Sequence, residues 1–420
     1  MTARKKIIVL GAGIIGACSA LRLQRDGHDV TLLDRDEPGL GSSFGNAGSI
    51  SGSGCIPMAL PGMLRNVPKW LFDPLGPLSV RRSYALRAAP WLFQWIRASR
   101  LDVVRAAADA LHALNAGPAD GYRALLSPDQ YGDLIQAAGC LHVWRKRPAG
   151  RTEALIRELR ATHGERAEEL GADAIRQLVP ALGNTITAGL LLPDSAHIRN
   201  PHRLVQALVC NLAEAGGRVV RDEVRGIGFG AAGPDRVVTR MGSLRFDGLV
   251  VAAGAFSGRV ASELGLRVPL EAERGYHLTV IDPSIRLPMP VAFGDHKFYA
   301  TPMETGLRLA GTAEFAGLAA APDWRRSEAL LANARRVLPG LDGSGTSVWM
   351  GRRPSIPDSV PIIGPSPKHA NVVLAFGHGH YGMCGGPGTG RLVADLVAGR
   401  APFIDPTPYS AERFTRAAAA

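Results

Sequence analysis

The chain has 420 residues, more than a single hydrophobic core usually organises, so we expect two domains. Its net charge is +11, from 48 Lys and Arg against 37 Asp and Glu. There is no basic block or aromatic-basic stripe, which argues against a nucleic-acid partner and favours an anionic ligand or membrane face. The five cysteines show no paired spacing, so the sequence predicts no disulfide framework and no metal site, and a reducing cytoplasm fits.

The N-terminal segment predicts a β-α-β unit, with strands at 6–10 and 28–33 around a helix at 14–25. Basic residues at 4–6 and the apolar run that ends at Ala20 imitate a secretory signal, but cleavage there would remove the unit, so we reject that interpretation. No apolar stretch is long enough to span a bilayer.

Glycines occupy the turn between the first strand and the helix, in the pattern Gly11-Ala12-Gly13-Ile14-Ile15-Gly16. Gly11 suits the tight turn, Gly13 lets the backbone approach a pyrophosphate, and Gly16 lets the helix pack against the strand. Asp34 ends the second strand, where a carboxylate can bind the ribose of a dinucleotide. The motif alone does not separate FAD from NAD(P).

Further elements follow in chain order. We expect a Gly/Ser-rich loop at 39–62, mainly helices at 63–135, a strand at 140–144, a helix near 151–170, and a helix from Asn200 to about Ala215 that leads into a strand at 218–220. Apolar runs at 249–253 and 372–376 suit strands covered on both faces, whereas 268–312 alternates like an antiparallel sheet. A helix is expected at 388–398.

The predicted fold is α/β, with a Rossmann-like FAD-binding domain and an inserted α+β substrate domain built on a large antiparallel sheet. We assign 1–85, 195–265 and 345–420 to the FAD-binding domain and 86–194 and 266–344 to the substrate-binding domain. Three further segments favour FAD: the loop Ser42–Gly48, the small residues that end the strand at 250–257, and the glycine-rich stretch 376–383 before the last helix.

Together these segments resemble the D-amino-acid oxidase superfamily of flavoproteins, and most closely its FAD-dependent D-amino-acid dehydrogenase branch. The resemblance covers about residues 5–415 and includes Asp34-Arg35, Asn46-Ala47-Gly48, Arg274-Gly275-Tyr276, Gly351-Arg352-Arg353-Pro354 and Gly377-His378-Gly379. The candidate cofactor-binding residues are Gly11, Gly13, Ile14, Ile15, Gly16, Asp34, Arg35, Ser42, Ser43, Asn46, Ala47, Gly48, Val224, Ala253, Gly254, Arg353, Gly377, Gly379, His380, Tyr381, Gly382 and Met383.

The resemblance implies oxidation of D-amino acids, with hydride moving from Cα to flavin N5 and water hydrolysing the imine to a 2-oxo acid and ammonia. The expected D-amino acid substrates include cyclic ones such as D-proline or hydroxyproline. The alternative substrate is another small amine, such as glycine, sarcosine or an N-alkyl amino acid. Residues 349–358 contain no Cys, so the flavin is expected to be non-covalent. An NAD(P) enzyme and a non-catalytic FAD-binding subunit are the remaining classes.

Arg353 aligns with the Gly-Leu-Arg-Pro arginine of the family and is the first candidate to bind the substrate carboxylate, because an Arg fork matches that group bidentately. Arg352 replaces an apolar residue of the family, which leaves open which arginine faces the site. Tyr276 is the second candidate for the carboxylate. His296, Tyr299, His380 and Tyr381 are candidates for lining the substrate side of the flavin.

The segment 56–100 combines Pro, aromatic and basic residues, including Lys69-Trp70-Leu71-Phe72 and Trp91 to Arg97. Amphipathic helices of this kind can lie on an anionic membrane. The expected partners are therefore a small D-amino acid or related amine, a quinone or other membrane electron acceptor, and a second copy of the chain. The expected location is the cytoplasm, with peripheral attachment to its side of the membrane; the alternative is a helix buried against its own domain.

Overall fold

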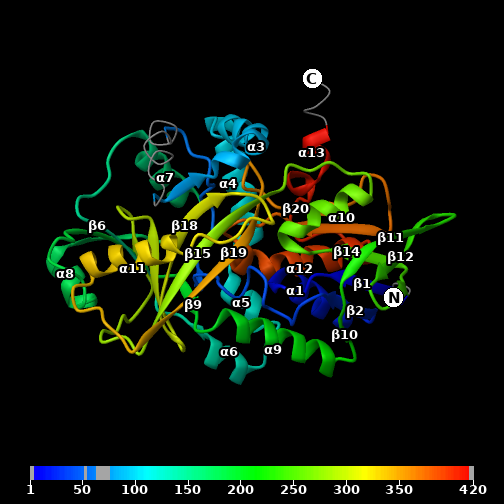
Figure 1. The fold of residues 1–420 in the computed structure, drawn as a ribbon, viewed down its shortest axis with the longest axis horizontal. Coiled ribbons are helices and arrows are strands. Elements are labelled where there is room, and N and C mark those ends of the chain that lie inside the picture. The colour runs from blue at the N-terminus through cyan, green and yellow to red at the C-terminus, as the bar shows by residue number, and fades with distance from the viewer. Residues whose placement is uncertain (1–3, 52–53, 63–75, 416–420) are drawn as a thin grey trace.

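The computed structural model describes residues 4–51, 54–62 and 76–415. Two large sheets lie side by side in it (Figure 1), one near the N-terminus and one formed by long strands in the middle of the chain. The mixed α/β fold confirms the expected fold class. The structure also contains two three-stranded sheets. One consists of β11 (Val224–Gly230), β12 (Gly233–Thr239) and β13 (Ser243–Arg245). The other consists of β3 (Ser49–Ile50), β9 (Ala196–Ile198) and β5 (Ile135–Gln136).

The first large sheet has six strands, all parallel except the last edge strand. Its inner strands are continuous apolar runs because both faces are covered. Ile7 and Val9 pack toward the core formed with helices, whereas Ile8 and Leu10 pack into a second core on the opposite face. In order, the strands are β10 (Arg218–Arg221), β2 (Asp29–Asp34), β1 (Lys6–Leu10), β14 (Gly248–Val251), β21 (Val372–Phe376) and β20 (Ile362–Pro365).

The second large sheet has nine strands. On β15, alternate residues such as Leu278 and Val280 pack into the core beneath α11, and the residues between them face the other way. The strands are, in order, β19 (Gly345–Ser355), β15 (Glu271–Ile281), β18 (Gly306–Phe315), β17 (Phe298–Met303), β16 (Val291–Phe293), β6 (Cys140–Trp144), β8 (Ala188–Leu192) and β7 (Glu168–Gly171), with β4 (Leu78–Val80) paired to β18.

Helices α1 and α12 pack closely together against the six-stranded sheet. The helices are α1 (Ile14–Arg25), α3 (Ala85–Ala98), α4 (Leu101–Asn115), α5 (Pro118–Arg123), α6 (Pro128–Leu134), α7 (Arg151–Thr162), α8 (Ala172–Leu178), α9 (Pro201–Glu214), α10 (Ser257–Glu263), α11 (Arg325–Val337), α12 (Gly382–Ala398) and α13 (Glu412–Thr415). Within the described ranges, no helix combines the length and apolar character needed to cross a membrane.

Two predicted boundaries were wrong. The helix expected near 151–170 ends at Thr162, because Gly164 adopts a left-handed φ of 67° and the chain then forms β7. The last helix begins at Gly382 rather than 388, although glycine disfavours helices. Close packing explains this: a Cβ at Gly388 would lie 2.3 Å from Leu114 O, and one at Gly390 would lie 2.8 Å from the backbone of Cys18.

The assignment of residues to two domains remains a proposal. Because β19 and β4 both pair within the nine-stranded sheet, we now propose that Gly345–Ser355 and Leu78–Val80 belong with the substrate-binding domain.

Candidate functional site

A cavity of about 1220 Å³ is lined by both large sheets. Segments far apart in the sequence meet there: the glycine turn after β1, the loop 41–47, the residues that follow β14, and residues 375–384 around the start of α12. The cavity-facing side of the nine-stranded sheet supplies the opposite wall. All the candidate cofactor-binding residues line this cavity except Gly16, which packs against Gly11 O, and Gly48, which packs against Met303 and Ile198 O.

The turn after β1 can only be made by glycine. Gly11 has a φ of 101°, and a Cβ there would lie 2.4 Å from Ala252 O. A Cβ at Gly16 would lie 1.8 Å from Gly11 O, so this residue allows α1 to start directly behind the turn. Gly13, the N-cap residue of α1, has no side chain to cap the helix, and the first amide of the helix, Ile14 N, donates to Ser43 Oγ instead. The first turn of α1 lies at the cavity wall, as in a helix N-terminal anion site.

Asp34 is fixed beside this turn. Its Oδ2 accepts a hydrogen bond from Ala12 N at 2.7 Å, and its Oδ1 accepts one from Asp36 N at 3.1 Å. The guanidinium of Arg35 lies 4.1 Å above the Phe256 ring. A carboxylate and a cation–π pair therefore mark the nucleotide end of the cavity.

The loop 42–48 is held by side chains of the nine-stranded sheet that sequence reasoning missed. Arg308 Nη1 donates to Phe44 O at 3.0 Å and to Asn46 O at 2.9 Å, and the His277 ring contacts Gly45 O at 3.2 Å. Burial lowers the pKa of Arg308 to about 10, which still leaves it charged at neutral pH. No local pattern identifies these residues, because each is distant from the loop in sequence.

The predicted loop residues also make fixed contacts. Ser43 Oγ accepts from Ile14 N at 3.0 Å, and Ser42 Oγ donates to Arg352 O at 2.5 Å. Asn46 Oδ1 accepts from Gly48 N at 2.8 Å. The loop is therefore shaped in advance rather than left open.

The segment before α12 turns sharply toward the cavity, with left-handed φ values of 91° at Gly377 and 50° at Gly379. Tyr381 is the N-cap residue of α12, but its side chain makes no hydrogen bond to the first turn of the helix. The N-terminus of α12, at Gly382 and Met383, lines the cavity. The Tyr381 phenol donates to Ile56 O at 2.6 Å. Burial raises the pKa of the neighbouring Cys384 to about 11, so this thiol is a packing residue.

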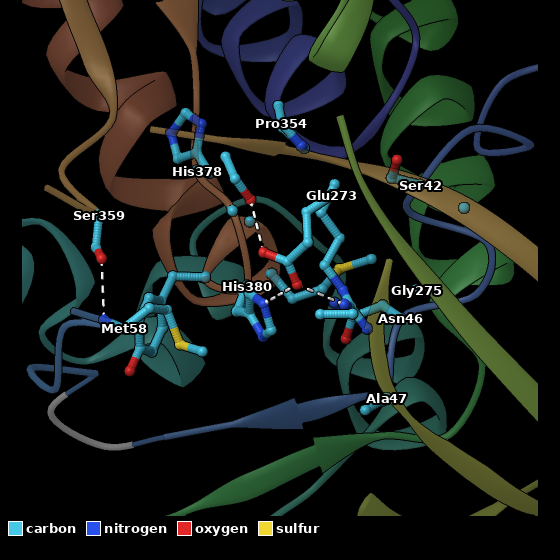
Figure 2. A pocket seen from close by; sticks show the side chains of 18 of the residues that line it. Ser42, Asn46, Ala47, Met58, Glu273, Gly275, Pro354, Ser359, His378 and His380 are labelled. Carbon is cyan, nitrogen blue, oxygen red and sulfur yellow. Dashed lines mark hydrogen bonds and ion pairs between the residues drawn. The ribbon is translucent and has the colours of Figure 1, made fainter. Parts of the chain in front are cut away.

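Glu273, on β15, is the centre of the polar site and was not predicted (Figure 2). Its Oε1 accepts from Arg353 Nη1 at 2.8 Å and from His380 Nε2 at 2.7 Å, and its Oε2 accepts from Ser355 Oγ at 2.9 Å. Burial alone would raise the pKa of Glu273, but His380, Arg353 and Ser355 outweigh it and hold the pKa well below its usual range. The carboxylate is therefore ionised at neutral pH.

Arg353 is held in one orientation. Its Nη1 also donates to Thr312 O at 3.0 Å. Thr312 adopts an unusual left-handed conformation, with a φ of 62°. Its guanidinium packs on Gly275, where a Cβ would lie 2.2 Å from Nη2. Among the described residues, Nε and Nη2 have no hydrogen-bond partner, so one edge of the fork is available to a ligand.

Of the other predicted substrate-side residues, Tyr276, Tyr299 and Arg352 line the cavity, and His296 does not. The Tyr276 phenol donates to Glu314 Oε2 at 2.6 Å and accepts from Asp323 N at 3.0 Å, so its polar end is already occupied. Arg352 Nε donates to Leu318 O at 2.7 Å. We therefore no longer propose Tyr276, His296 or Arg352 as substrate contacts.

A Rossmann-type sheet joined to a large antiparallel sheet by one deep cavity defines a dinucleotide-dependent oxidoreductase. The family of FAD dependent oxidoreductases known as DAO matches residues 6–396, and the chain belongs to this family. It is 37% identical over 417 residues to a D-amino-acid oxidase of Bradyrhizobium diazoefficiens, across 98% of this chain and 99% of the relative. It is 35% identical over 424 residues to a D-amino acid dehydrogenase of Paramagnetospirillum magneticum, with 98% and 99% covered.

Solved structures share the fold. An L-proline dehydrogenase from P. horikoshii superposes with a TM-score of 0.74 at 18% identity, covering 99% of both chains. A glycine oxidase from Geobacillus kaustophilus gives 0.70 at 22% identity, covering 97% of this chain and 98% of the other. The cofactor is FAD, and the cavity fits it: the Gly11 turn leaves no room for a Cβ, Asp34 is fixed for a ribose, and the N-termini of α1 and α12 line the same space.

We predict that Gly11→Ala protein is purified with little or no bound flavin, because the new Cβ meets the Ala252 backbone. The measurement is the visible flavin absorbance relative to protein absorbance. Gly132→Ala is the control, since Gly132 lies in α6 with open space around its Cβ position, and it should keep a full complement. A Gly11→Ala protein as yellow as the wild type would contradict the assignment of the turn.

Proposed function

We propose that this enzyme oxidises D-amino acids by oxidative deamination. One observation carries the proposal: the Arg353 guanidinium is fixed through Nη1 alone, with its other edge available, beside the buried Glu273 carboxylate that pairs with the exposed His380. The names of the two curated relatives support the same substrate class.

Arg353 binds the substrate carboxylate in this proposal. Glu273 and Thr312 O fix Nη1, so the Nε–Nη2 edge can form a bidentate pair without first losing side-chain freedom. Such a charge-assisted contact contributes on the order of 1.5–3 kcal/mol.

His380 takes the proton that the substrate ammonium must lose before its nitrogen can form a C=N bond. Its Nε2 contacts Glu273 at 2.7 Å, and the carboxylate stabilises the imidazolium that results. Glu273 is thus a positioning residue for both Arg353 and His380. Bound FAD supplies the acceptor for the hydride that leaves Cα, and water then hydrolyses the released imine to a 2-oxo acid and ammonia.

We predict that D-amino acids bleach the flavin spectrum under anaerobic conditions and that their L-enantiomers do not. Glycine and sarcosine belong in the same assay, since oxidation of another small amine on this fold is the alternative. Bleaching by L-amino acids alone, or by sarcosine alone, would contradict the proposed substrate class. No bleaching by any amine would indicate a non-catalytic FAD-binding subunit.

We predict that Arg353→Lys raises the KM for D-amino acids by about tenfold or more, because a lysine cannot form the bidentate pair. Arg352→Lys is the matched control, as its side chain donates to Leu318 O instead, and its KM should change by less than about twofold. Steady-state kinetics with an artificial electron acceptor measures both. Equal effects at the two positions would remove Arg353 from the carboxylate role.

We also propose that helix α3 rests on an anionic membrane and that a lipid-soluble acceptor such as a quinone reoxidises the flavin. Leu86 and Phe93 on this helix are 91% and 61% exposed, and the exposed Arg87 and Arg97 accompany them. The opposite side of α3 contributes Trp91, Leu92 and Trp95 to the cavity wall. The basic and aromatic residues expected within 63–75 lie outside the described residues.

We predict that the protein binds phosphatidylglycerol vesicles at low salt and is released by high salt. A Leu86→Ser/Phe93→Ser double variant should bind about tenfold more weakly, because it removes the exposed apolar area. Met241→Ser, at another exposed apolar position, should bind like the wild type. Vesicle sedimentation measures all three, and equal binding by the double variant would contradict the role of α3.

A further inference from the structure

The cavity continues past Tyr381 into an inner chamber, which we define by His142, Arg160, Glu165, Tyr299 and Tyr381. These residues come from β6, the end of α7 and the loop after it, β17, and the N-terminus of α12. None of them serves as the carboxylate anchor or as the proton acceptor. The chamber is therefore a part of the site that the proposed chemistry leaves unexplained.

The chamber adjoins the anchor. Tyr381 directly follows His380, which contacts Glu273. Burial raises the pKa of the Tyr381 phenol well above its ordinary value, and Cys384, Cys55, Tyr299 and Glu165 add to this rise, so these groups lie close around it. A substrate held by its carboxylate beside His380 thus has the chamber within reach of its side chain.

Two of the chamber's polar side chains are available to a ligand. His142 and Tyr299 share one face of the sheet, because Ala292 pairs with both, and their rings meet edge to face at 6.0 Å. Neither ring makes a hydrogen bond to another described residue. Burial, helped by Arg160 and Lys297, lowers the pKa of His142 to about 3, so the neutral ring offers one donor and one acceptor. Burial keeps the Tyr299 phenol protonated by raising its pKa.

The charged residues of the chamber cancel one another. Arg160 Nε lies 3.0 Å from Glu165 Oε2, and both side chains are almost fully buried. Ser51 Oγ donates to Glu165 Oε1 at 2.9 Å. A charged side chain entering beside this pair would lose its hydration, and Lys297 at the cavity wall is exposed, so it would return only a screened counter-charge. The chamber therefore suits a group that is polar but uncharged.

We infer that the inner chamber selects D-amino acids whose side chain carries a hydroxyl or carboxamide over apolar D-amino acids of the same shape. This inference rests on the proposed function and specifies its substrate class. The physical reason is the cost of leaving His142 and Tyr299 unpaired beside an apolar side chain. A site built to hydrogen-bond a substrate group discriminates strongly against the analogue that lacks it.

The test compares matched pairs, D-asparagine with D-leucine and D-threonine with D-valine, in the holoenzyme. We expect kcat/KM to favour the polar member of each pair by about tenfold or more. Tyr299→Phe should reduce that ratio by about threefold or more by lowering kcat/KM for the polar member alone. Tyr131→Phe is the control, since this tyrosine lies outside the cavity lining, and it should leave the ratio unchanged.

His142→Phe provides a second variant if Tyr299→Phe does not fold, and it should reduce the ratio in the same way. Ratios near one, or in favour of the apolar members, would overturn the inference while D-amino acids still bleach the flavin and the proposed function stands. A variant that slows both members equally would also overturn it. If no D-amino acid bleaches the flavin, the proposed function fails, and the inference fails with it.

Discussion

The buried carboxylate of Glu273 connects the two halves of the enzyme. It accepts hydrogen bonds from Arg353 and Ser355 on β19 and from His380 in the segment that leads from the six-stranded sheet to α12. Glu273 is the buried member of this network, whereas Arg353 and His380 are partly exposed to solvent. The orientation of the proposed carboxylate anchor and of the proposed proton acceptor therefore depends on the side chain of Glu273, which has neither role itself.

The sign of the pKa shift at Glu273 gives this network a defined pH range. Its folded pKa lies below that of an unfolded glutamate, so its contribution to stability is fully present above the unfolded pKa. The contribution is lost as the pH falls through the folded pKa, when the carboxylate must accept a proton. Near neutral pH the carboxylate is ionised and the network is intact.

The local part of the site could be predicted from the sequence. Short-range patterns predict the glycine turn, Asp34 and the strands β1, β14 and β21. A turn that admits only glycine requires glycine in the sequence, and a strand covered on both faces requires a continuous apolar run. No local sequence pattern identifies Glu273, Arg308 or His277 as site residues. Each acts on a segment at least 80 residues away, so only the pairing of strands shows what it contacts.

His296 and Tyr299 show the same limit within one short segment. Tyr299 lies within β17, where alternation directs its ring to the cavity. His296 precedes the strand, next to Lys297, whose left-handed φ of 55° turns the chain before pairing begins. Residue type made both histidine and tyrosine reasonable candidates, but the start of the strand decides which one faces the site.

The register between β15 and β19 determines the whole polar site. Glu273 lies opposite Arg353, Gly275 opposite Gly351, and His277 opposite Trp349, so the members of each pair project from the same face. The residues between them, among them Arg274, Tyr276 and Arg352, project from the other face toward Glu314 and Leu318. A shift of one residue on either strand would place Arg352 opposite Glu273, or Arg274 opposite Arg353. Strand pairing thus places Arg353, and not Arg352, against Glu273.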